Sequence, residues 1–363
     1  MADALPGGTR PAAAVARIAL TRYHSGPANA EKLMKTSLAL LIILWSATAA
    51  VAETPQQQPV VEEWQVPWEN SRPRDPYVGP DGKVWFVGQR GHYVASLDPE
   101  TGEFRRIDLE PGTGPHNLIV ADDGTIFYAG NLTRHIGRLD PETGRVEKIE
   151  MPDEAARDPH TLTFDDSGDI YFSVQGGNFL GKLNVESEQV ELVGVPTEKA
   201  RPYGIVVAPS GTVWATEFGS NKLAKLNPET LALSEIVLPR ESARPRRLAA
   251  TSDGRIWYVD YAKGRLGFLH PDTGLFKEYP APGGVDSRPY GMAVDKDDML
   301  WFVETGLSPN RLTGFDPVAE AFTTPVEIPS GGGTVRHMFY DANEDVIWFG
   351  ADTNTIGRAD LSP

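Results

Sequence analysis

Hydrophobic and polar residues follow a unit that recurs along most of the chain. Each unit opens with a short apolar run, such as residues 117–120, and a second apolar run follows a turn built on Asp-Gly, as at 123–124 and 253–254. Two such runs joined by a Gly-containing turn are typical of a β-hairpin. An alternating run such as 221–226 and a last run such as 276–279 complete the unit. The pattern therefore predicts four short β-strands in each repeat.

A proline marks the start of the first predicted strand, and Val335 takes its place in the last copy. The prolines are Pro73, Pro115, Pro159, Pro202, Pro245 and Pro289. Their spacing of about 43 residues is the period of four-stranded propeller blades. Turns after the third strand, at 98–102, 140–144 and 270–274, combine an early Pro with a final Gly, as tight turns require. We predict an all-β fold, a seven-bladed β-propeller of four-stranded antiparallel blades.

The two ends of the repeat array predict how the ring closes. The last copy ends after its third strand, at 355–360, whereas the segment 61–67 stands alone and resembles the fourth-strand segment 276–282. We expect the N-terminal strand to complete the last blade, because a closed ring leaves no sheet edge open for aggregation.

The residues before the repeats are typical of an export signal. Met34-Lys35 precedes an apolar run at 38–45 and an A-x-A sequence at 50–52, the order found in secretory signal peptides. The apolar run is shorter than the roughly 20 residues of a membrane anchor. We predict a non-structural upstream extension at 1–33, a signal peptide at 34–52 cleaved near Ala52, and one propeller domain at 53–363 that is periplasmic or secreted.

Composition narrows the range of ligands. The chain has no cysteine, which excludes disulfides and thiolate chemistry, and its net charge is −16. An acidic protein disfavours nucleic acid and anionic membranes and leaves cations or neutral small molecules as ligands. We expect a monomer that binds a small molecule at the channel mouth.

The hairpin geometry predicts which side chains meet at that mouth. The first strand of a blade lines the channel, and its start lies at the same end as the end of the second strand. The residues after the repeat proline are Arg74, His116, His160, Tyr203, Arg246, Tyr290 and, in the last blade, Arg336 or His337. The residues taken as the ends of the second strands are Gln89, Asn131, Gln175, Glu217, Asp260, Glu304 and Asp352.

The mixture of side chains predicts a metal site. The carboxylates Glu217, Asp260, Glu304 and Asp352 are the hard oxygen ligands that suit Mg²⁺ or Ca²⁺. Two histidines on the opposite half are possible bases or ligands. We expect the other mouth residues to bind substrate: Arg74, His116, His160, Tyr203, Arg246, Gln89, Asn131 and Gln175. The alternative is a wet mouth without an ion, in which arginines at 246 and 336 pair with the carboxylates.

The repeats resemble those of the virginiamycin B lyase (streptogramin lyase) family. Blades of that family read P-x-G-I, then D-G-x-h-W-F-T-E, then N-K-I-G-R-h, where h is apolar. The matching segments are 135–139, 201–205, 288–292, 300–304 and 355–358. The resemblance covers roughly residues 60–361 and implies a propeller fold.

The resemblance also implies a catalytic constellation, from which this chain departs. It implies a Mg²⁺ ion, a catalytic His after the repeat proline of the last blade, a second His one blade earlier, and a Glu after the last Trp. Tyr290 stands at the second His position and Asp352 at that of the Glu. Counting back from Asp341 puts Arg336 at the catalytic position, whereas counting back from Trp348 puts His337 there. His337, Arg336 and Tyr290 are therefore the candidate catalytic residues.

Three functions remain open. The family's reaction opens a cyclic ester by elimination, in which a base removes an acidic α-proton while the metal stabilises the charge on the carbonyl. The first possibility is a lyase of this type, acting on a macrocyclic lactone or another ester. The second is a metal-dependent lactonase resembling gluconolactonase. The third is a non-catalytic periplasmic ligand-binding propeller, which a metal-free carboxylate cluster paired with Arg246 would favour.

Overall fold

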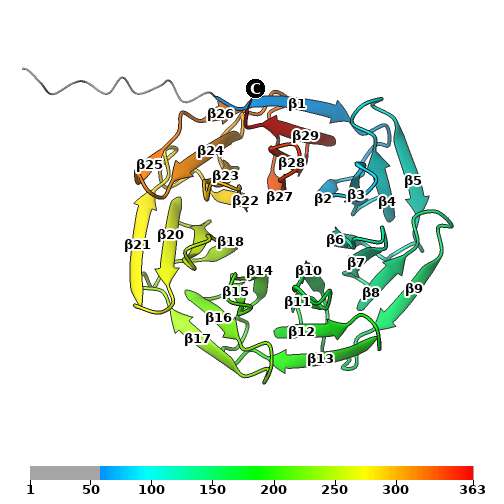
Figure 1. Ribbon diagram of the computed structural model, residues 1–363, viewed down its shortest axis with the longest axis horizontal. Helices are drawn as coiled ribbons and strands as arrows, with labels where there is room; N and C mark the ends of the chain where they lie inside the picture. The colour runs from blue at the N-terminus through cyan, green and yellow to red at the C-terminus, as the bar shows by residue number, and fades with distance from the viewer. Residues whose placement is uncertain (1–57, 363) are drawn as a thin grey trace, which may run out of the picture. The chain divides into compact units, whose positions relative to one another are not determined.

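The computed structural model describes residues 58–362, which form seven β-sheets arranged around a central channel. In Figure 1 the innermost strand of each sheet borders the channel, and the later strands lie progressively further out. The prediction of a seven-bladed, all-β propeller is confirmed. The predicted signal peptide and upstream extension lie outside the described residues. Within 58–362 no helix is long and apolar enough to span a membrane.

The blades follow one another along the chain. The first contains β2 (Pro73–Val78), β3 (Val84–Gly88), β4 (Tyr93–Leu97) and β5 (Phe104–Asp108). The second contains β6 (Pro115–Val120), β7 (Ile126–Gly130), β8 (His135–Leu139) and β9 (Val146–Glu150). The third contains β10 (Pro159–Phe164), β11 (Ile170–Val174), β12 (Phe179–Asn184) and β13 (Gln189–Gly194). The fourth contains β14 (Pro202–Val207), β15 (Val213–Glu217), β16 (Lys222–Leu226) and β17 (Leu233–Val237).

The remaining blades keep this plan. The fifth contains β18 (Pro245–Ala250), β19 (Ile256–Asp260), β20 (Arg265–His270) and β21 (Leu275–Pro280). The sixth contains β22 (Pro289–Val294), β23 (Leu300–Glu304) and β24 (Arg311–Asp316), with an outer edge split into β25 (Ala321–Phe322) and β26 (Val326–Glu327). The seventh contains β27 (Val335–Asp341), β28 (Val346–Ala351), β29 (Thr355–Asp360) and the N-terminal β1 (Val60–Gln65).

The ring is closed by the two ends of the propeller, as predicted. β1 pairs antiparallel with β29, from Val60 opposite Asp360 to Gln65 opposite Thr355. The Trp64 ring packs on Trp348 at 5.6 Å between ring centroids. This pairing covers the outer edge of β29, which would otherwise be open.

The hydrophobic core lies between neighbouring blades. One cluster joins Phe127 and Ile136 of the second blade to Leu162 and Phe172 of the third, and similar clusters follow around the ring. Each blade therefore buries its faces against its neighbours, which is how repeat folds gain stability.

The pairing of the first two strands fixes which residues reach the channel mouth. Pro202 lies opposite Glu217, and Val335 lies opposite Ala351 in the same relation. Arg336 is therefore the residue after the proline position, and His337 is one residue further along. In the first three blades the residues opposite the repeat proline are Gly88, Gly130 and Val174. The predicted ends of the second strands were therefore misaligned by one residue. Glu217, Asp260 and Glu304 lie directly opposite the repeat proline. Gln89, Asn131, Gln175 and Asp352 lie one residue beyond that position.

Candidate functional site

The residues after the repeat proline gather where the seven inner strands begin, an end of the channel that we call the proline-side mouth. Arg74, His116, His160, Tyr203 and Tyr290 are buried there, and Arg246 and Arg336 are half-buried. The repeat proline, or Val335 in the last blade, begins the inner strand directly before each of them, so every blade delivers one side chain to the same level.

Two histidines of this ring pack against each other, and one of them packs against a tyrosine. The ring centroids of His116 and His160 are 3.6 Å apart, and those of His160 and Tyr203 are 4.0 Å apart. His116 Nδ1 lies 3.2 Å from the carbonyl oxygen of His160. Burial, and then the neighbouring arginines, lower the pKa of both imidazoles well below the ordinary value. Both histidines are therefore neutral at pH 7.

Two tyrosines meet in the same ring. The hydroxyls of Tyr203 and Tyr290 form a hydrogen bond across the channel. Burial by itself would raise the pKa of Tyr203, but the charges of Arg246, Arg74 and Arg247 outweigh it and lower this pKa to about 8. Burial, and then the neighbouring Tyr203, raise the pKa of Tyr290 instead. Tyr203 is thus the more acidic hydroxyl of the pair.

The guanidinium of Arg246 lies in a box of aromatic rings. Its central carbon is 3.7 Å from the ring centroid of Tyr290, 4.3 Å from that of Tyr261 and 4.5 Å from that of Phe218. Its Nε is buried without a hydrogen-bond partner, and no carboxylate of residues 58–362 forms an ion pair with it. Pairing of Arg246 with the predicted carboxylate cluster is therefore wrong, and cation–π contacts hold this side chain instead.

Arg336, in contrast, has a carboxylate partner. Its two terminal nitrogens bind both oxygens of Asp352, with Nη2 at 2.6 Å from Oδ2, and Arg72 Nε is 3.6 Å from Oδ1. Burial would raise the pKa of Asp352, but Arg336 outweighs it and lowers the pKa. An ion pair thus joins the two positions at which the family resemblance implies a catalytic His and a Glu. With Tyr290 at the second His position, these residues do not fit the Mg²⁺ site that the resemblance implies.

The other predicted metal ligands are held inside their own blades. Glu217 accepts a hydrogen bond from Ser220 Oγ at 2.7 Å. Asp260 accepts from the backbone N–H groups of Arg244 and Ala262 at 3.0 and 3.1 Å. Glu304 accepts from the N–H of Gly283 at 2.6 Å and from Arg311 Nη2 at 2.7 Å.

These contacts contradict the predicted carboxylate cluster. Glu217, Asp260 and Glu304 precede the mouth position by one residue, and successive side chains of a strand point to opposite faces. Within 58–362 no three His, Cys, Asp or Glu side chains stand close enough to hold a metal ion. The divalent cation stays a prediction for which the described residues supply no ligand set.

The residues one position later do reach the mouth. Gln89 Oε1 accepts from Arg74 Nη1 at 3.1 Å, and Asn131 Nδ2 donates to the Pro159 carbonyl at 3.3 Å and to Asp158. Gln175 holds the same position in the third blade, and Phe218 and Tyr261 hold it in the fourth and fifth.

Sequence reasoning missed Phe218, Tyr261 and Asp158. Gln89 follows Trp85 by four residues. The same count from Trp214 and from Trp257 leads to Phe218 and Tyr261 and would have found them. Burial raises the pKa of Asp158 to about 6, which makes it a further titratable group at the mouth.

A second layer of side chains crosses the channel beneath this ring. Arg247 donates to Thr161 Oγ1 and to the carbonyl of Arg336, both at 3.0 Å, and its Nη2 is 3.4 Å from Asp75 Oδ2. His337 belongs to this layer, and burial together with the Arg247 charge lowers its pKa to about 4. The candidate base His337 therefore lies below the proline-side mouth, while Arg336 lies at it.

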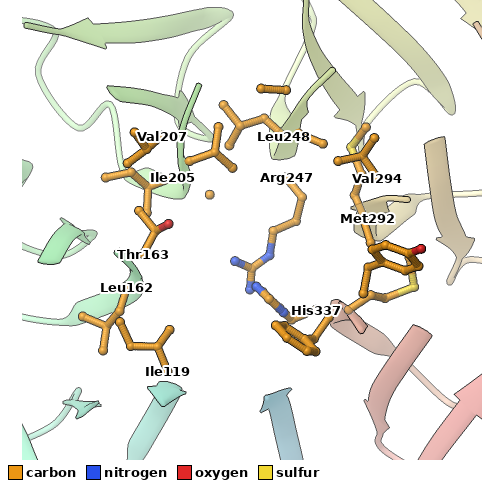
Figure 2. Close-up of a pocket in the computed structure, with 18 of the residues that line it drawn as sticks. Ile119, Leu162, Thr163, Ile205, Val207, Arg247, Leu248, Met292, Val294 and His337 are labelled. Carbon is orange, nitrogen blue, oxygen red and sulfur yellow. The ribbon is translucent and has the colours of Figure 1, made fainter. Parts of the chain in front are cut away.

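A cavity of about 540 Å³ occupies the channel on the other side of this layer. Figure 2 shows Arg247 and His337 close together in this cavity, with Leu162, Ile205, Leu248 and Met292 along its walls. The lining comes from the later halves of the inner strands, and no residue directly after a repeat proline contributes to it.

These features define a seven-bladed β-propeller with a basic, aromatic mouth and a ligand-sized cavity in its channel. The chain belongs to the virginiamycin B lyase family, whose model matches residues 43–307 and 189–362. Curated proteins yield no match.

Solved structures share the fold. A streptogramin B lyase is 23% identical with a TM-score of 0.75, over 84% of this chain and 98% of that one. Selenomethionine-substituted virginiamycin B lyase from Staphylococcus aureus is 20% identical with a TM-score of 0.75, over 84% and 99%. A catalytically inactive variant of the Staphylococcus aureus enzyme, solved with quinupristin, is 20% identical with a TM-score of 0.76, over 84% and 99%.

Proposed function

We propose that this chain is a carbon–oxygen lyase that opens a cyclic ester or lactone at the proline-side mouth, with Arg246 in the role that the family resemblance gives to a metal ion. Membership of the virginiamycin B lyase family supports the reaction class. The observation that carries the proposal is the unpaired guanidinium of Arg246 beside the Tyr203–Tyr290 hydroxyl pair.

The chemistry needs a base and a positive charge. A base removes the proton from the carbon next to a carbonyl, the electron pair forms a carbon–carbon double bond, and the adjacent carbon–oxygen bond of the ester breaks to release a carboxylate. Tyr203 serves as the base, because its lowered pKa of about 8 leaves part of it ionised near neutral pH. Arg246 stabilises the negative charge that develops on the oxygen of that carbonyl as the proton leaves, because a guanidinium donates charge-assisted hydrogen bonds.

The product mass distinguishes the alternatives. Residues 53–363 are incubated with quinupristin and with smaller macrocyclic lactones, with and without chelator, and the products are measured by mass spectrometry. Elimination opens the ring without a change of mass and continues in chelator. A metal-dependent lactonase would add one water and stop in chelator, which would contradict the proposal.

Variants test the assigned roles. Tyr203→Phe is expected to lower kcat by about a hundredfold, the usual effect of removing a general base, and to abolish the rise in rate toward pH 8. Arg246→Met is expected to slow the reaction to a similar extent. Tyr340→Phe, which lies among the cavity-lining residues and not at the mouth, is the control. Unchanged kcat in Tyr203→Phe would reject Tyr203 as the base.

A second candidate is a binding propeller without catalysis. The burial of the tyrosine pair favours it, because Tyr203 is 4% exposed and Tyr290 is 1% exposed. Calorimetric binding of a lactone whose ring stays closed over long incubation would support this candidate and exclude the lyase.

A further inference from the structure

We propose that the cavity below Arg247 is a second ligand site, which binds a small carboxylate with an apolar body. This inference is independent of the proposed lyase, because the residues that line the cavity are separate from the ring at the proline-side mouth.

The first argument is an excess of buried positive charge. Arg74, Asp75 and Arg247 are 4%, 1% and 3% exposed. Arg74 Nε is 3.5 Å from Asp75 Oδ1, and Arg247 Nη2 is 3.4 Å from Asp75 Oδ2. One carboxylate therefore faces two guanidinium groups. A buried charge that lacks a partner is costly, so an anion beside Arg247 offsets that cost.

The second argument is an unpartnered polar atom at the same place. Nδ1 of His337 is buried and has no hydrogen-bond partner among residues 58–362, and His337 lines the cavity beside Arg247. Arg247 uses Nε for the Arg336 carbonyl, Nη1 for Thr161 and Nη2 for Asp75, so these contacts use three of its five N–H groups and leave two for a ligand. The arginine and histidine are thus placed to bind a carboxylate group.

The third argument is the shape and polarity of the walls. Beyond Arg247 and His337 most of the lining is apolar, with Leu162, Leu248 and Met292 among the side chains. Its other polar members include Asn117, Thr163 and the exposed Asp166. The cavity volume of about 540 Å³ lies within the range of small-molecule sites. A ligand with a charged head and a hydrocarbon body matches both parts, whereas a small inorganic anion would leave the apolar part unfilled.

The test uses octanoate and its uncharged counterpart octanamide, with binding to residues 53–363 measured by calorimetry. The wild type is expected to bind octanoate more tightly than octanamide. Arg247→Met is expected to weaken octanoate binding about tenfold or more, because a charge-assisted contact is lost, with little change for octanamide. Arg246→Met is the matched control, because it removes the neighbouring arginine that contacts the mouth and not the cavity, and octanoate binding should persist.

A second pair of variants tests the location without touching the charged layer. Val294 lies in the cavity wall, and Val294→Phe should weaken both probes by reducing the space. Val237→Phe, at a 59% exposed position on β17, is the control for added bulk. The proposal fails if octanoate does not bind, if Arg246→Met and not Arg247→Met abolishes its binding, or if Val294→Phe binds it as the wild type does. If Arg247→Met does not fold, as thermal unfolding would reveal, the Val294→Phe comparison decides.

Discussion

The first and second blades fill one position of the propeller differently from the fourth to sixth blades. This position is the last residue of the second strand. In the first two blades it is Gly88 or Gly130, and the ring of Tyr93 or His135 from the third strand occupies the space above it. In the later blades it is Glu217, Asp260 or Glu304, opposite Lys222, Arg265 or Arg311.

This difference explains why three carboxylates recur without forming a metal site. The backbone pairing is the same in both groups, so each blade must fill the same space near the mouth. A glycine allows a large ring to enter from the neighbouring strand, whereas a carboxylate fills the space itself and binds loop N–H groups or a basic side chain. The repetition of Glu217, Asp260 and Glu304 therefore reflects packing within single blades.

The largest expected effect tests the packing of a third-strand ring over a glycine, as in the first two blades. A Cβ added at Gly88 would lie 2.1 Å from Cζ of Tyr93, which is too close for a real contact. Gly88→Ala should lower the free energy of unfolding by about 3 kcal/mol, the upper part of the usual range for overpacking. Chemical denaturation measures this change. Gly194→Ala is the control, because its Cβ would meet its nearest neighbour at 4.0 Å, and equal stability of the two variants would contradict the comparison.

The next effect tests the buried carboxylate that fills the same position in the sixth blade. Glu304 is fully buried and accepts from both Gly283 and Arg311. Glu304→Gln should lower the free energy of unfolding by about 2 kcal/mol, because it removes the charge that faces Arg311. The exposed Glu327→Gln on the same blade should change stability little. A stabilised Glu304→Gln protein would show that this carboxylate is not required for packing.

The smallest effect distinguishes Glu217 from Glu304. Burial raises the pKa of Glu217 from 4.5 to about 7, so the folded state holds a proton that the unfolded state has lost between these pH values. Stability from this group is therefore lost as pH rises through that window. Glu217→Gln should be more stable than the wild type at pH 8, by on the order of 1 kcal/mol, and nearly equal at pH 5. Thermal unfolding at the two pH values measures this, and an equal difference at both would refute the raised pKa.

The net charge of the chain does not report the charge at the proline-side mouth. A net charge of −16 predicts cations or neutral molecules as ligands. Yet Arg74, Arg246 and Arg336 gather at the mouth. Arg336 pairs there with Asp352, Arg74 pairs with Asp75 of the layer below, and within residues 58–362 no carboxylate pairs with Arg246. Local fields depend on which charges the fold brings together, and a sum over the chain does not contain that information.

The sequence by itself determined the architecture. Repeats of about 43 residues, turn residues at fixed places and an unpaired N-terminal segment predicted seven blades and a ring closed by β1 on β29. These features are local or periodic, so they can be read without knowing what packs against what. The residues after the repeat proline were found in the same way, and the structure places them at one mouth.

Only the tertiary structure decided what that mouth is made of. A shift of one residue turns a strand side chain to the other face, so the choice between Arg336 and His337, and the misplacement of Glu217, Asp260 and Glu304, depended on pairings that the repeat did not resolve. The aromatic box around Arg246 combines side chains from the fourth, fifth and sixth blades. The cavity behind Arg247 likewise depends on residues from all seven blades. Each blade contributes only a few residues to each of these sites, and closure of the ring brings those residues together.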